Sequence, residues 1–506
     1  MAAHSPASGL GLAWCGCALA ALLLGCTASR TRGPGEGEGE GEGAAPDLAA
    51  ADADADGGGR ADLEPGDTSP ASPDLRPDSG RDAPDGGDDL GPDGGEGPDG
   101  GTSVRCQVPE ELLERTFELL PDAPDTQIHA TLAVAGDRIW LAYNLPEADG
   151  TGGFDVWLAA LDCAGRLVVA PRLAHTGDPG NDVDPALAVG RDSLLVAWSS
   201  DAGGDPNLLL YTRAFTRHGA PLGDAERLLT PGYDGAPLLG NALAPRLAAL
   251  TDGSFLLAAL WGVPAAARFQ LLVHRLDAAG QPPEATPGAP AEAILARLEP
   301  GVDQDGPAVA VLPDGTAHLA WARSTATEAP QVVHTRLAAD ARSTDPAPVT
   351  ALPSTASSTP SLAVAPDMIE EPYVYLAFQR EGAEQDILLQ DASLLMPEAP
   401  HKAFGLRGKA DVAPAVAAAP GGGLLAWYRI RSGFRSDLLV RGFAYDGYTF
   451  TATGPERVLN PAEEEDEHAA APYGIALAHL GEGVYLVVWS EGTSPRFRLR
   501  ARFVRG

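Results

Sequence analysis

The sequence predicts an all-β fold in which seven similar units, each of about four strands, are repeated radially. Three observations predict it. Apolar runs of four to eight residues, rich in Val, Leu and Ala and bounded by Gly, Asp-Gly or Pro, are typical of strands. From Cys106 to Gly506 these runs recur at a spacing of 49 to 63 residues. That period is too long for leucine-rich or hexapeptide coils and suits radial sheet repetition.

Each unit has a strand that follows a proline, a tight turn, a second strand that ends in an aromatic residue, a polar loop, and a third strand. The second unit shows this pattern from Asp184 to Trp198 and from Asn207 to Gly223. The aromatic residues that end the second strands are Tyr143, Trp198, Trp261, Trp321, Phe378, Trp427 and Trp489. The pattern resembles a seven-bladed β-propeller, which would occupy residues 106–506. We expect the recurrent tryptophans to pack in the core between blades rather than to stack on a ligand.

A fourth strand is expected between consecutive units, and six candidates are found. They are Leu167 to Leu173, Glu226 to Leu229, Ile294 to Leu298, Val349 to Leu352, Ala403 to Leu406, and Glu456 to Leu459. The seventh candidate, Glu114 to Leu120, precedes the first unit, whereas the sequence stops directly after the last third strand. We therefore expect the N-terminal strand to complete the last blade and close the ring.

Residues 1–25 read as an export signal. The run from Gly9 to Cys26 is apolar, uncharged and of the length of a signal h-region. Its end, Leu23-Leu24-Gly25-Cys26, resembles the lipobox of bacterial lipoproteins. The resemblance implies that Cys26 is lipidated and that the protein is exported to the outer membrane or cell surface. A plain cleaved signal and a single anchoring helix are the alternatives.

Residues 26–105 predict a disordered acidic tether. The segment is rich in Gly, Asp, Glu and Pro and has almost no side chains that could build a core. Asp52, Asp54, Asp56 and Gly57 match the first half of a calcium loop, but Leu63 stands where that loop needs a bidentate Glu. Low complexity is therefore the favoured interpretation of this segment.

Charge and cysteine content restrict the partners and the compartment. A net charge of −35, with Lys402 and Lys409 the only lysines, argues against nucleic acid as a partner. Apart from the signal, every apolar run is too short to span a membrane, so we expect the protein to contact the membrane only through its N-terminal lipid. We also expect the protein to be a monomer. In an exported domain, Cys106 and Cys163 are expected to form a disulfide that clamps the closure point.

Two sets of residues are candidates for binding, and both lie in the longer loops opposite the short hairpin turns. Carboxylates that precede first strands could hold a cation such as calcium or contact a substrate, or they could only cap turns; these are Asp182, Asp184, Asp303, Asp305 and Asp411. A basic and aromatic connection could contact a partner, or could form internal salt bridges; its candidate residues are Tyr428, Arg429, Arg431, Phe434 and Arg435.

Catalytic signatures are absent from the sequence: there is no Gly-x-Ser-x-Gly, His-Glu-x-x-His or P-loop motif. We therefore expect a binding or scaffolding module of the cell envelope, with no cofactor and with a protein or glycan ligand. A polysaccharide hydrolase or lyase that uses carboxylates at the channel mouth is the alternative, because paired carboxylates from different blades leave no trace in the sequence. A purely structural envelope protein is the third possibility.

Overall fold

The computed structural model describes residues 106–506 with gaps. The gaps are 125, 148–152, 177–179, 203–206, 224–225, 230, 234–235, 238–239, 264–267, 283–290, 293–294, 298–300, 339–349, 352–356, 366–371, 381–385, 394–400, 406–408, 433–434, 461–469 and 494–495. The predictions for the signal, Cys26 and the tether lie outside the described residues. In the part of the chain that is described, no helix has the length and apolar character needed to cross a membrane.

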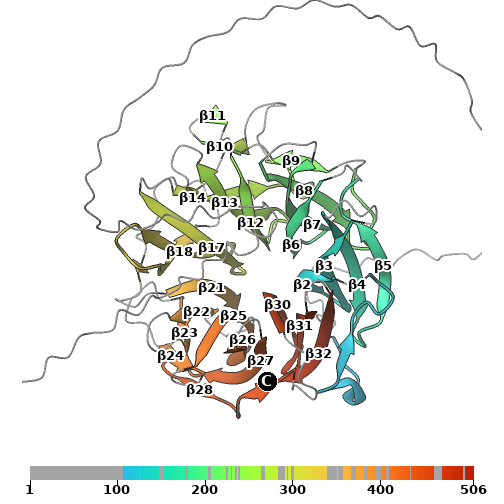
Figure 1. The fold of residues 1–506 in the computed structure, drawn as a ribbon, viewed down its shortest axis with the longest axis vertical. Coiled ribbons are helices and arrows are strands. Elements are labelled where there is room, and N and C mark those ends of the chain that lie inside the picture. Colours follow the sequence, from blue (N-terminus) through green and yellow to red (C-terminus); the bar gives the residue numbers. More distant parts are fainter. Residues whose placement is uncertain are drawn as a thin grey trace, which may run out of the picture. The chain divides into compact units, whose positions relative to one another are not determined.

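Seven antiparallel sheets make up the seven blades of a β-propeller, as the repeats predict. The blades surround a common axis, and the first strand of each lies nearest to it (Figure 1). The first two blades are β2 (Ile128–Ala135), β3 (Arg138–Pro146), β4 (Phe154–Asp162) and β5 (Leu167–Leu173), then β6 (Asp182–Val189), β7 (Ser193–Ser200), β8 (Leu209–Thr216) and β9 (Arg227–Leu229). The third is β12 (Ala242–Ala249), β13 (Phe255–Val263), β14 (Arg268–Leu276) and β16 (Leu295–Arg297). The fourth is β17 (Val302–Val311), β18 (Ala317–Thr325), β19 (Gln331–Leu337) and β20 (Thr350–Ala351).

The remaining blades follow the same order. The fifth is β21 (Ser357–Val364), β22 (Val374–Arg380), β23 (Asp386–Asp391) and β24 (His401–Phe404). The sixth is β25 (Ala410–Ala419), β26 (Gly422–Ser432) and β27 (Arg435–Tyr445), whose outer edge is shared by β28 (Phe450–Ala452) and β29 (Arg457–Val458). The seventh is β30 (Ala470–Gly481), β31 (Val484–Thr493) and β32 (Arg496–Arg505) with β1 (Thr116–Glu118). A small additional sheet joins β10 (Pro231–Tyr233), β11 (Ala236–Pro237) and β15 (Ala291–Glu292), and a 3₁₀ turn spans Glu110–Leu112.

The ring closes as the sequence predicts. β1 pairs antiparallel with β32, so that Thr116 faces Arg502 and Glu118 faces Arg500. Phe117 also stacks on Phe503, with ring centroids 5.5 Å apart. The N-terminal strand thus supplies the outer edge of the last blade, and the two ends of the ring are hydrogen-bonded to each other.

A disulfide joins Cys106 to Cys163, the pair expected from the sequence. Cys106 is buried next to the closing strand, and Cys163 lies in the turn that follows β4 of the first blade. The bond therefore links the segment that completes the seventh blade to the first blade.

The tryptophans that end the second strands are core residues. Trp198, Trp261, Trp321, Trp427 and Trp489 are each no more than 3% exposed. They pack among Leu, Val and Ala of adjacent blades; Trp198, for example, shares a cluster with Trp140 and Leu158 of the first blade. The expectation that these rings serve the core rather than a ligand is confirmed.

The first strands share a bulge that explains the proline of the repeat. In six of them the register with the second strand shifts around a residue with positive φ; these residues are His129, Asp184, Ala244, Gly306, Thr359 and Ala413. A proline follows five of these residues, all except His129. Because left-handed backbone is costly for a residue with a Cβ, its recurrence at five non-glycine positions indicates that a geometry repeated around the ring imposes it.

Candidate functional site

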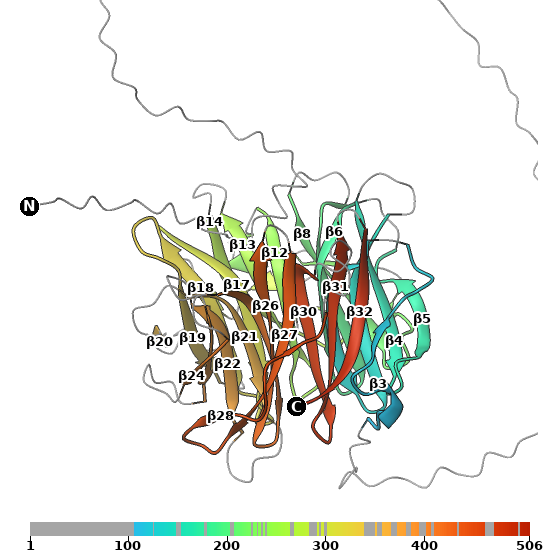
Figure 2. The same cartoon turned by 60° about the horizontal axis from the view of Figure 1, so that its bottom comes forward.

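The strand order gives the ring two different faces. Each first strand ends in a short turn to the second strand, and Gly253 and Gly315 take positive φ in two of these turns. The opposite face carries the connections into the first strands and those between second and third strands. Figure 2 shows the strands running side by side between these faces. We call this opposite face the loop-bearing face, and it is the face on which the sequence predicts function.

A cavity of about 300 Å³ lies in the central channel, lined by first strands of six blades. Most of its lining is small or apolar, but His129, Asp184 and Arg246 also line it. Nδ1 of His129 lies 3.1 Å from Oδ1 of Asp184. His129 and Asp184 occupy equivalent bulge positions of β2 and β6, and Arg246 follows the bulge of β12. Three neighbouring blades therefore each bring one charged or titratable side chain to the channel.

Asp184 is the centre of this channel group. Burial raises the pKa of its carboxyl, but the hydrogen bond from His129, the charges of His129 and Arg246, and the amide of Ala244 outweigh it, so the pKa is lowered. Asp184 is therefore ionised at neutral pH. Its side chain keeps about a quarter of its surface open to the channel, so a ligand can still reach it.

Arg246 faces two carboxylates. Burial lowers the pKa of its guanidinium, and the charges of Asp184 and Asp305 oppose that effect. Burial likewise raises the pKa of Asp305, as does the charge of Asp303, against the Gly306 amide and Arg246. The channel therefore holds a guanidinium, a carboxylate and an imidazole, and the charge of Asp305 from the fourth blade also acts on the guanidinium.

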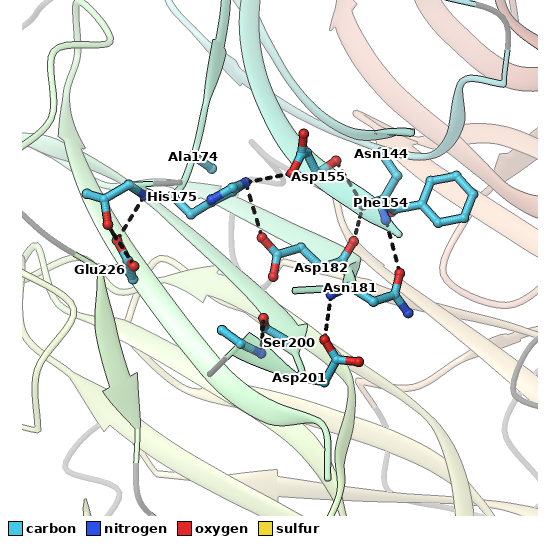
Figure 3. Close-up of polar contacts among 12 residues, drawn as sticks. Asn144, Phe154, Asp155, Ala174, His175, Asn181, Asp182, Ser200, Asp201 and Glu226 are labelled. Atoms are coloured by element: carbon cyan, nitrogen blue, oxygen red, sulfur yellow. Dashed lines mark hydrogen bonds and ion pairs between the residues drawn. The ribbon is translucent and has the colours of Figure 1, made fainter. Parts of the chain in front are cut away.

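A second group of polar side chains lies on the loop-bearing face where the first two blades meet (Figure 3). Nε2 of His175 lies 3.2 Å from Oδ1 of Asp155 and 3.2 Å from Oδ2 of Asp182. Asp155 is near the start of β4, His175 follows β5, and Asp182 begins β6. We call these three residues the interblade triad. His175 and Asp182 are buried, and Asp155 is partly exposed.

Neighbouring polar groups hold the interblade triad in place. Nδ2 of Asn144 donates to the carbonyl oxygens of Asp182, at 2.7 Å, and of Asp155, at 3.3 Å. On the far side, the amide and hydroxyl of Thr176 donate to the carboxylate of Glu226. The backbones that carry the triad are therefore fixed by hydrogen bonds on both sides, as Figure 3 shows.

His175 and Asp182 of the triad have shifted pKa values. Burial raises the pKa of Asp182 to about 7, as does the charge of Asp155, while a hydrogen bond from Ser200 and the charge of His175 oppose the shift. Burial lowers the pKa of His175, but the hydrogen bond to Asp155 and the charges of Asp182, Asp155 and Glu226 outweigh it, so the pKa is raised. Such coupled, perturbed groups on a loop-bearing face are typical of functional sites.

The five predicted carboxylates do not form one site. Asp184 lines the channel with Arg246, Asp305 acts on Arg246 through its charge, and Asp182 belongs to the interblade triad. Asp303 accepts a hydrogen bond from the amide of Phe269 in the preceding blade. Asp411 is fully buried against Arg429. Asp303 and Asp411 thus make contacts within the fold that differ from the turn caps given as the alternative in the sequence analysis.

The predicted partner-binding segment also needs correction. Tyr428 is fully buried, and its hydroxyl donates to the carbonyl of Gly474; Arg429 is buried between Asp411 and Glu456. Neither side chain is available to a partner, because the two point to opposite faces of β26 and both are buried. Arg431 is about half exposed and pairs with Asp437. Arg435 begins β27, and Phe434 lies outside the described residues. Internal salt bridges, the second interpretation, are thus present for Arg429 and Arg431.

Sequence analysis missed four residues of these groups: His129, Arg246, Asp155 and His175. An alignment of the repeats would have found the first, since His129 and Asp184 stand where the other units have Ala, Gly or Thr at the bulge. No comparable signal exists for Asp155 and His175, which lie in parts of the unit that vary from blade to blade.

Comparisons with known proteins add little to this geometry. No family model and no curated protein matches the chain. Among solved structures, a polysaccharide lyase of family PL25, an ulvan lyase, is similar with a TM-score of 0.48 and 8% identity over 77% of this chain and 96% of its own. A protein of unknown function from Dyadobacter fermentans has a TM-score of 0.45 and 12% identity over 77% and 97% of the two chains. An α-L-arabinanase of Penicillium chrysogenum has a TM-score of 0.41 and 15% identity over 63% and 92%. These similarities are too weak to carry an argument about activity.

Proposed function

We propose that the protein is an exported, lipid-anchored propeller that binds an acidic glycan at the central channel. The observation that carries the proposal is the group formed by His129, Asp184 and Arg246 in a channel lined otherwise mainly by small and apolar side chains. A lipid on Cys26 would hold the domain at the envelope, and the acidic tether would keep it away from the surface.

The chemistry of the channel group fits a sugar that carries a carboxylate. The guanidinium of Arg246 can bind a carboxylate with two parallel hydrogen bonds. Ionised Asp184 accepts hydrogen bonds from sugar hydroxyls, and His129 adds a ring that exchanges donor and acceptor roles. A cavity of about 300 Å³ is at the lower end of the volumes that hold small ligands, which suits one sugar unit rather than a long stretch of chain.

Titration of the full chain with matched neutral and uronic-acid oligosaccharides, followed by calorimetry, tests the proposal. We expect saturable binding of the uronic-acid series and a loss of at least ten-fold in affinity in Arg246→Gln. Arg431→Gln is the control, because it removes a guanidinium that lies away from the channel group. Equal affinity for both series, or a loss in Arg431→Gln with Arg246→Gln unchanged, contradicts the proposal.

Cleavage of such a glycan is the second candidate function, and the contact between His129 and Asp184 favours it. A carboxylate that orients an imidazole is an arrangement suited to general base catalysis. Incubation with the same oligosaccharides distinguishes cleavage from binding, because only an enzyme releases shorter products. We expect His129→Gln to abolish product formation while it reduces affinity only in part. Absence of both binding and products would leave a structural role in the envelope.

A further inference from the structure

The interblade triad brings three metal-ligating atoms together without the aid of a common strand. One oxygen of Asp155, Nε2 of His175 and one oxygen of Asp182 all lie within 4.8 Å of one another. Asp155 and His175 belong to the first blade, and Asp182 opens the second. Figure 3 shows the two carboxylates, from neighbouring blades, pointing at the same ring nitrogen.

A single N–H of His175 cannot make a good hydrogen bond to both carboxylates of the triad. The nitrogen has a single N–H to donate, yet two carboxylate oxygens lie at the same distance of 3.2 Å from it. Charge-assisted N–H···O bonds are shorter, about 2.7 to 2.9 Å. Donors that share a metal ion at about 2.1 Å are roughly 3.0 to 3.5 Å apart in octahedral or tetrahedral geometry. The two distances from the imidazole nitrogen are therefore those of neighbouring ligands of one ion, and the two carboxylate oxygens lie within 4.8 Å of each other.

The charge and the burial of the triad also favour a bound metal ion. Asp182 is 2% exposed and His175 is 7% exposed, and both are directed into the cluster. Buried carboxylates are paired with cations or bind metals, because an isolated buried charge is costly. The nearby guanidinium of Arg213 donates to the carbonyl of Ala174 and acts on Glu226. A dication would balance the charge of Asp155 and Asp182 at the point where they converge.

From this geometry we propose that Asp155, His175 and Asp182 form a divalent metal site of the Mn²⁺ to Zn²⁺ class. One imidazole nitrogen with two carboxylate oxygens suits these ions better than Ca²⁺, which prefers oxygen ligands alone. Three protein ligands leave at least one position for water or a ligand, on the side of the partly exposed Asp155. Asn144 is a positioning residue, since it holds the backbones of both carboxylates.

The site has a structural consequence for the channel. Asp182 and Asp184 are two residues apart on β6, with Asp182 in the triad and Asp184 in the channel group. An ion bound to Asp182 would fix the start of β6 against the first blade, and with it the contact between Asp184 and His129. The metal site does not rest on the proposed glycan, because its ligands are different side chains and metal binding is measured without any glycan.

Metal content and metal affinity of the full chain test the site. The protein is stripped with a chelator, and Zn²⁺, Mn²⁺ and Ca²⁺ are then titrated separately by calorimetry and by the shift in melting temperature. We expect about one Zn²⁺ or Mn²⁺ per chain, an increase in melting temperature, and a much weaker response to Ca²⁺. An X-ray anomalous signal at the triad in metal-soaked crystals would place the ion.

Two variants and a control separate ligation from hydrogen bonding. Asp155→Asn and His175→Gln should each lower Zn²⁺ affinity at least ten-fold. In Asp155→Asn a hydrogen-bond acceptor remains, so the melting temperature of the stripped protein should change little. His218→Gln, which alters an exposed histidine beside Arg138, should bind metal like the wild type. Absence of saturable binding by Zn²⁺ and Mn²⁺, or unchanged affinity in both triad variants, overturns the proposal.

Discussion

Oε1 of Glu114 accepts a hydrogen bond from Nη1 of Arg457 at 2.7 Å, although 343 residues separate the two in the chain. The same carboxylate accepts a hydrogen bond from the backbone amide of Arg505 and lies 3.3 Å from Nη2 of Arg502. Glu114 therefore links the segment just before β1 to the sixth and seventh blades. The contact lies at the seam where the ring closes.

Removal of this carboxylate should weaken the closure. We expect Glu114→Ala to lower the free energy of unfolding by about 1 kcal/mol, since the side chain is partly exposed and its ion pairs are screened by solvent. Glu110→Ala is the matched control, because Glu110 pairs with Arg505 at a highly exposed site. Urea denaturation of both variants checks the difference. An equal effect of the two substitutions would contradict a special role for Glu114.

The disulfide should contribute more to stability than the ion pairs of Glu114. It closes a loop with a sequence separation of 57 residues, for which loop-closure entropy predicts a stabilisation of about 4 kcal/mol. We expect Cys106→Ala, Cys163→Ala and the double variant to lose similar stability, because each breaks the same bond. Unfolding with and without reductant measures the effect. A wild type that is insensitive to reductant would argue against a role of the bond in stability.

The buried ion pair of the sixth blade should be far more sensitive than the exposed one. Asp411→Ala leaves the guanidinium of Arg429 buried without its bidentate partner, which should cost about 3 to 5 kcal/mol. Arg431→Ala removes a half-exposed side chain that pairs with Asp437, and should cost less than about 1 kcal/mol. Chemical denaturation compares the two. A small loss in Asp411→Ala would mean that Glu456 alone suffices for Arg429.

Acid should destabilise the fourth blade through His318 and His334. Their rings are buried, and Nδ1 of His318 lies 3.0 Å from Nε2 of His334. Burial lowers the pKa of His318 to about 4, helped by the charge of Arg336 and opposed by that of Asp314. Burial also lowers the pKa of His334 to about 3, with the charges of His318 and Arg336.

The sign of the pH effect follows from these shifts. Below about pH 6.5 the two histidines are protonated in the unfolded chain but stay neutral in the folded protein. The free energy of unfolding should therefore fall as the pH decreases from 6.5 toward 4. Replacement of both histidines by Gln should flatten this part of the profile, whatever its effect at pH 7. His218→Gln, at an exposed position, should leave the slope unchanged. Urea midpoints measured from pH 7.5 to 4.5 test the prediction, and equal slopes in all three proteins would refute it.

Much of the fold could be predicted because each repeat carries the same short-range pattern of strands and turns. The strand from Leu167 to Leu173 has the bounds expected from the sequence, and the closing strand lies within the predicted Glu114 to Leu120. The fourth strand of the sixth blade was only partly predicted, since β28 and β29 share its outer edge. Strands at an outer edge are short and carry little apolar alternation, so their patterns are weak.

The functional side chains were harder to predict, because the type of a residue does not tell which way its side chain points in the folded protein. Tyr428 and Arg429 look like surface contacts in the sequence, yet β26 buries both. Asp303 and Asp305 are two residues apart, but Asp303 caps the amide of Phe269 while Asp305 acts on Arg246. Only the fold decides which of these carboxylates meets a cation.

The sequence by itself determined the seven units, the tryptophan core, the closure by an N-terminal strand and the pairing of Cys106 with Cys163. These features follow from periodic burial and from turn residues, which act over a few residues and repeat along the chain. The tertiary structure alone decided that Asp182 joins Asp155 and His175 while Asp184 joins His129 and Arg246. The reason is physical: the bulge at Asp184 turns the strand, and contacts between blades bring together residues that no local pattern relates.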